Sequence, residues 1–77
     1  MSTNDLAVCV RNTLNRYFDD LEGEKPSGVY DMVVQNVERS MLETIMQHAD
    51  GNQTLAADML GINRNTLRRK LTDYQLL

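Results

Sequence analysis

The sequence predicts an all-α protein of four helices that ends in a helix-turn-helix. Two long stretches, residues 5–21 and 28–48, carry apolar residues at helical spacing. Two shorter stretches, residues 53–60 and 64–74, flank a glycine turn. The chain has 77 residues, of which 42% are hydrophobic, so it suits one small domain and is too apolar for a disordered tail.

The first helix is expected from about Asp5 to Leu21, with Asn4 as a candidate N-terminal cap. Apolar residues recur along it at the spacing of one helix face, namely Leu6, Val10, Leu14, Tyr17, Phe18 and Leu21. The segment EGEKPSG that follows contains glycine and proline and indicates a turn. Ser27, near the end of this turn, is a candidate cap for the next helix.

The second helix is expected over residues 28–48, and its apolar residues cover more than one narrow stripe. They are Val29, Tyr30, Met32, Val33, Val34, Val37, Met41, Leu42, Ile45 and Met46. One side can pack on the first helix. A second copy of the chain is the most economical partner for the rest, because a small monomer buries little apolar surface. The alternative is a monomer in which the last two helices cover these residues.

We therefore predict a homodimer in which residues 1–50 form the dimerisation helices. The residues expected at the subunit interface are Val33, Val37, Met41, Ile45, Leu14 and Phe18.

Residues 51–77 form the predicted helix-turn-helix. Its first helix is expected over residues 53–60, capped by Asn52 and ended by Gly61, since glycine reaches positive φ without a steric penalty. Its second helix is expected over residues 64–74, after a cap at Asn63. Counted from Gln53 as the first position, alanine falls at the fifth, glycine at the ninth and leucine at the fifteenth. This spacing lets two helices meet closely at a steep angle.

Basic residues are concentrated in this segment, although the whole chain has a net charge of −3. Residues 1–50 hold four basic and nine acidic residues, a net −5, whereas residues 51–77 hold four basic and two acidic residues, a net +2. A phosphate responds mainly to nearby cations, because salt screens charges beyond about 8 Å. Four cations within residues 64–70, with a leucine seam behind them, favour DNA binding over an ordinary solvated face.

The predicted DNA contacts divide into two groups. A recognition helix that enters the major groove by its first turns presents Arg64, Asn65 and Arg68 to the bases. Arginine can bind guanine, and asparagine adenine, through two hydrogen bonds each. Polar and basic side chains beside these are better placed for phosphates, namely Thr54, Asn63, Thr66, Arg69 and Lys70.

The motifs GNQT, Ala56-Ala57 and LGINRNTLRRKL resemble the Fis family of bacterial nucleoid proteins. They are also similar to the C-terminal domains of NtrC-type activators, but 77 residues leave no room for a receiver or ATPase domain. The resemblance implies an intertwined homodimer core, recognition helices in successive major grooves, and bent DNA that is read partly through its deformability. It also adds Asn52 to the phosphate contacts, and implies roles in transcriptional regulation and nucleoid organisation.

Three positions depart from the pattern that the resemblance implies. Leu55 stands where the family often has arginine and Asp73 where it often has a basic residue, so each is expected to remove a phosphate contact. Ser40 replaces a proline, so no kink is expected in the second helix. The chain starts close to its first helix, and we expect it to lack the β-hairpin arms with which some Fis proteins activate a DNA invertase.

The remaining residues favour no catalytic or metal site. His48 is the only histidine and has no nucleophile at a suitable spacing, while Cys9 is the only cysteine and suits a reducing cytoplasm. We expect no cofactor, metal, small-molecule ligand, membrane contact or enzymatic activity, and a location in the cytoplasm, on the nucleoid. Two alternatives remain open: a helical dimeric protein-interaction module, and a stand-alone effector domain of an NtrC-type activator. Steeply salt-dependent DNA binding excludes the first.

Overall fold

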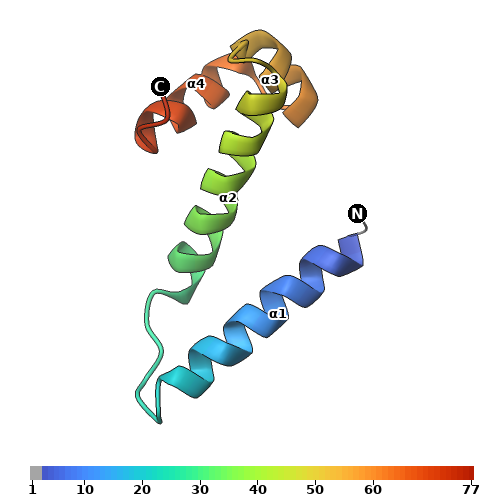
Figure 1. The fold of residues 1–77 in the computed structure, drawn as a ribbon. Coiled ribbons are helices and arrows are strands. Elements are labelled where there is room, and N and C mark those ends of the chain that lie inside the picture. Colours follow the sequence, from blue (N-terminus) through green and yellow to red (C-terminus); the bar gives the residue numbers. More distant parts are fainter. Residues whose placement is uncertain (1–2) are drawn as a thin grey trace. The chain divides into compact units, whose positions relative to one another are not determined.

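The computed structural model describes residues 3–77, which form four α-helices and no strand (Figure 1). In chain order these are α1 (Thr3–Asp20), α2 (Val29–His48), α3 (Gln53–Leu60) and α4 (Arg64–Asp73). The predicted all-α class is confirmed. The chain divides into two compact units, Met1–Val33 and Val34–Leu77. None of the helices in the described residues is long and apolar enough to cross a bilayer.

The first unit contains α1 and the start of α2, and none of its residues 4–33 is buried. The expected cap at Asn4 is wrong, because α1 already begins at Thr3. Asn4 instead lies in the first turn of α1. The backbone N–H groups of this turn have no partner within the helix, so polar side chains are tolerated beside them. Gly28, with φ of 66°, lies directly before α2, and its carbonyl accepts the Met32 amide at 3.0 Å. Ser27 therefore lies one residue outside the cap position.

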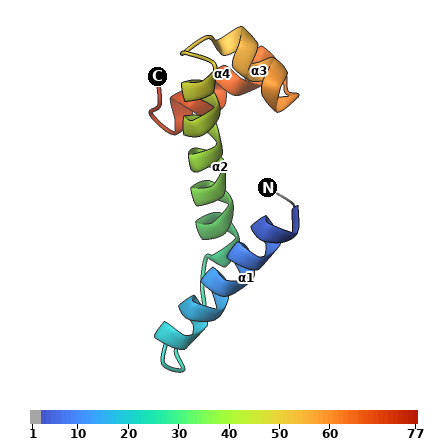
Figure 2. The ribbon, with the colours of Figure 1, turned by 45° about the vertical axis from the view of Figure 1, so that its right-hand side comes forward.

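The second unit packs α3 and α4 at the C-terminal end of α2 (Figure 2). Its core consists of buried leucines and alanines: Leu42, Ala49, Ala56, Ala57, Leu67 and Leu71. Partly buried Ile45, Met46, Leu60, Ile62, Tyr74 and Leu76 pack against this core. The small side chains at the centre of α3 permit the close approach of α4, as the predicted spacing requires.

Candidate nucleic-acid interface

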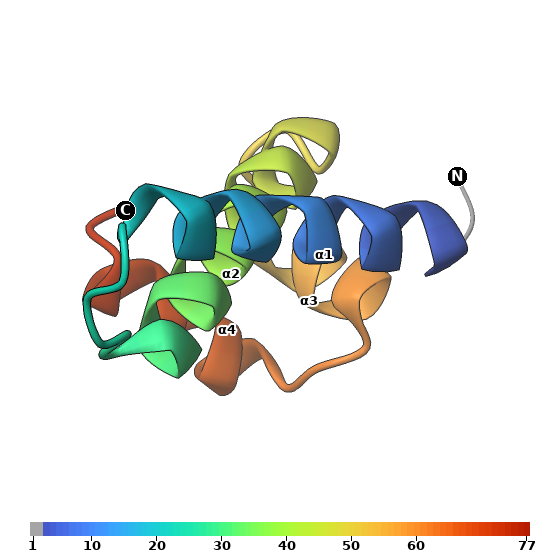
Figure 3. The same ribbon diagram turned by 90° about the horizontal axis from the view of Figure 1, so that it is seen from below.

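Local hydrogen bonds set the ends of α3 and α4. The Asn52 side chain accepts the Leu55 amide at 3.1 Å, and the Asn63 side chain accepts the Asn65 amide at 2.7 Å. Gly61 adopts the left-handed conformation, with φ of 74°, and its amide donates to the Ala57 carbonyl at 2.9 Å. These bonds confirm both predicted N-terminal caps and the glycine stop. Figure 3 shows the loop that they create between α3 and α4.

α4 is apolar on its inner side and basic on its outer sides. Leu67 and Leu71 are each 0% exposed and hold the helix against the core. The predicted base-reading residues Arg64, Asn65 and Arg68 are all exposed, and so is Arg69. Within residues 3–77, no carboxylate forms an ion pair with the guanidinium group of Arg64, Arg68 or Arg69. Their hydrogen-bond donors are therefore available to an external acceptor such as a guanine edge or a phosphate.

The predicted phosphate contacts near the helix starts are also accessible. Asn52, Thr54 and Asn63 are exposed, and Thr66 is half-buried. Each capping asparagine uses its side-chain oxygen within the chain, which leaves the amide –NH₂ group as a donor. These side chains can thus stabilise the turn and bind a phosphate oxygen at the same time.

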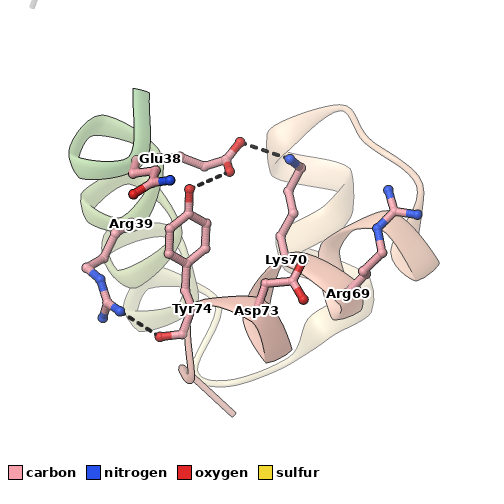
Figure 4. A pocket seen from close by; sticks show the side chains of 7 residues that line it. Glu38, Arg39, Arg69, Lys70, Asp73 and Tyr74 are labelled. Carbon is pink, nitrogen blue, oxygen red and sulfur yellow. Dashed lines mark hydrogen bonds and ion pairs between the residues drawn. The ribbon is translucent and has the colours of Figure 1, made fainter. Parts of the chain in front are cut away.

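Lys70, the remaining predicted phosphate contact, is already paired within the chain. Its Nζ lies 3.0 Å from Oε2 of Glu38 on α2, and the two side chains are 34% and 23% exposed (Figure 4). An ammonium group carries three donors, so this bond leaves others for a phosphate.

Glu38 belongs to a network that the sequence alone does not predict. Its Oε1 accepts the Tyr74 hydroxyl at 2.8 Å (Figure 4). Arg39 donates to the Tyr74 carbonyl at 2.7 Å, and its guanidinium lies 5.6 Å from the centre of the Tyr74 ring. These side chains border an open pocket of about 460 Å³, lined by Gln35, Glu38, Arg39, Arg69, Lys70, Asp73 and Tyr74. No sequence period links partners that lie 32 to 36 positions apart.

The network also shifts the ionisation of its members. The hydrogen bond from Lys70, followed by that from Tyr74, lowers the pKa of Glu38 from its ordinary value of 4.5. The same carboxylate raises the pKa of Tyr74 from 10.0, because it accepts a hydrogen bond from the phenolic hydroxyl. Glu38 is therefore held as a carboxylate and Tyr74 as a neutral phenol.

The residues predicted at a subunit interface differ in their surroundings. Val37, Met41 and Phe18 are 41%, 44% and 49% exposed, while Leu14 and Val33 are half-buried. Ile45 packs against the helix-turn-helix core of its own chain.

The positions that depart from the family pattern leave the helices intact. Leu55 is 45% exposed on α3, and Asp73 is exposed at the end of α4. α2 runs without interruption through Ser40, whose carbonyl accepts the Thr44 hydroxyl at 2.8 Å.

Cys9 and His48 are both exposed. In the part of the chain that the structure describes, no group of three or more potential metal ligands occurs.

Comparison with known sequences identifies the family. Residues 33–74 match the profile of the bacterial regulatory proteins of the Fis family. A Fis-like DNA-binding protein of Ralstonia nicotianae is 58% identical over 77 residues, which is 100% of both chains. One of Neisseria meningitidis serogroup A is 51% identical over 73 residues, 95% of this chain and 92% of its own. Proteins of this family are DNA-binding regulators and not enzymes. The chain therefore belongs to the Fis family of bacterial regulatory proteins.

Proposed function

We propose that this protein acts as a homodimer that binds and bends duplex DNA, and so contributes to transcriptional regulation and nucleoid organisation in the cytoplasm. The observation that carries the proposal is the outer surface of α4, where Arg64, Arg68 and Arg69 are exposed and have no carboxylate partner within residues 3–77. Of the residues on this helix, Arg64, Asn65 and Arg68 read bases. The phosphate contacts are Asn52, Thr54, Asn63, Thr66, Arg69 and Lys70.

Exposed apolar residues support the homodimer. Val37 and Met41 lie one turn apart on α2, and Phe18 on α1 is 49% exposed. A small domain with large apolar side chains open to water is stabilised when a second copy covers them. Residues 1–50 then serve as the dimerisation part and residues 51–77 as the DNA-binding part of one structural domain.

Geometry and charge support a two-helix DNA site. α4 has 10 residues and so spans about 15 Å, which suffices for one major groove and not for two. Two copies supply two recognition helices, and duplex DNA bends if these lie closer than one helical turn of straight DNA. The acidic residues of the first 50 positions repel phosphates, whereas the basic residues of α4 attract them. DNA is therefore directed to the α4 surface.

Titration of fluorescent duplexes tests DNA binding. Random and A-tract-flanked duplexes are compared over a series of salt concentrations, and we expect log affinity to fall steeply with log salt. Affinity that does not respond to salt would favour the alternative of a protein-interaction module. This chain covers 100% and 92% of the lengths of the Ralstonia and Neisseria relatives.

Two further measurements test assembly and bending. Analytical ultracentrifugation at micromolar protein is expected to show a dimer, and a stable monomer would contradict the proposal. Circularly permuted duplexes that carry one site are expected to migrate differently according to the position of the site. Equal migration of all permutants would show that the DNA stays straight.

A further inference from the structure

Two kinds of contact hold α4 on α2. Leu67 and Leu71 share the apolar core with Leu42, and apolar contacts have little directional preference. Near the end of α4 the contacts are hydrogen bonds to Glu38 and Arg39, which are strongly directional. The apolar core therefore determines that α4 packs on α2, whereas the polar contacts restrict the rotation of α4 on that surface.

Glu38 is placed to restrict this rotation. Its two carboxylate oxygens accept from two different residues, Lys70 at 3.0 Å and Tyr74 at 2.8 Å. These partners lie four positions apart, so they are neighbours on one face of α4. A single carboxylate thus bridges one full turn of the recognition helix. Arg39 completes the attachment by donating to the Tyr74 carbonyl at the helix end.

We propose that Glu38 is a positioning residue for DNA recognition, which sets the orientation of α4 relative to the dimerisation surface of α2. This inference rests on the proposed homodimer. Glu38 directly follows Val37, which belongs to the predicted interface, and Met41 lies one turn further along. The residue therefore connects the subunit interface to the recognition helix through one side chain. In a dimer, the orientation of each α4 determines the separation of the two half-sites.

The test uses a duplex library with a randomised core, from which each protein selects its preferred sequences. The variants are Glu38→Ala, Glu38→Gln and Tyr74→Phe, the last of which removes the hydroxyl and keeps the ring beneath Arg39. Glu43→Gln is the matched control, because Glu43 is an exposed glutamate on the same helix. Two quantities are read separately: the base preference within a half-site, and the distribution of distances between half-sites. Thermal unfolding checks that each variant folds.

We expect Glu38→Ala to keep the half-site sequence and to broaden the spacing. The enrichment of the best spacing over its neighbours should fall by roughly threefold to tenfold, the size of a coupling that one such network carries. Tyr74→Phe and Glu38→Gln should show smaller changes of the same kind, and they carry the test if Glu38→Ala does not fold. An unchanged spacing distribution in the folded variants would overturn the inference, even if affinity or stability declines. If the wild-type protein selects no paired half-sites, the proposed dimeric function fails as well, and the wild-type result alone reveals it.

Discussion

Replacement of Leu67 by alanine should remove a large part of the stability of the helix-turn-helix. Leu67 is 0% exposed and lies in the core with Leu42, Leu71 and the two alanines of α3. Its side chain packs α4 against the core. Loss of the three outer carbon atoms leaves a cavity that the short helices can only partly close.

The expected cost follows from this burial. Truncation of a fully buried leucine to alanine destabilises a protein by about 2–5 kcal/mol. A domain of 77 residues is stable by roughly 4–12 kcal/mol in total. The substitution therefore removes about a sixth or more of the available free energy of unfolding. With a urea m-value of about 1–2 kcal/mol per molar, a loss of ~3 kcal/mol lowers the midpoint by ~1.5–3 M.

The assay is urea unfolding followed by far-ultraviolet circular dichroism, at one fixed protein concentration because a dimer's stability depends on it. Leu55→Ala is the matched control, since it makes the same chemical change at a side chain that is 45% exposed. The control should change the free energy of unfolding by less than about 1 kcal/mol. Equal losses in the two variants would refute the reasoning, because burial would then not determine the cost.

Four further predictions concern DNA contacts and pH. Arg64→Ala should weaken specific binding by ~1–3 kcal/mol in a gel-shift titration, whereas Arg11→Ala, the same change on α1, should not; equal affinities for the wild type and Arg64→Ala would contradict the base-reading role. Lys70→Ala should weaken binding to all sequences alike and flatten the salt slope by about one unit, and a loss confined to particular sequences would argue against a phosphate contact. The pKa of Glu38 is lowered on folding, so its contribution to stability is fully present above the unfolded value of 4.5 and is lost as the pH falls from there through the lower pKa of the folded state; Glu38→Gln should lessen this acid sensitivity in urea titrations. The pKa of Tyr74 is raised, so its contribution is complete below 10.0 and declines at higher pH, and a pH dependence that persists in Tyr74→Phe would count against this assignment.

Elements that depend on near neighbours were predictable from the sequence. The caps at Asn52 and Asn63 bind amides two or three residues away, and Gly61 ends α3 through its own backbone conformation. The burial of Leu67 and Leu71 follows from their four-residue spacing on one helix face. The cap at Asn4 was wrong because Ser2, Thr3, Asn4 and Asp5 are all polar residues that can cap a helix, so the local sequence does not single out one of them.

The sequence by itself determined the four helices, the turn between α3 and α4, and the cluster of cations on α4, because each depends on residues within about one helical turn. Only the tertiary structure decided which of those cations has a partner. Glu38 is one of nine acidic residues in the first 50 positions, and nothing in its local sequence distinguishes it. It meets Lys70 and Tyr74 because the apolar core brings α4 beside α2, and that approach joins residues 32 and 36 positions apart.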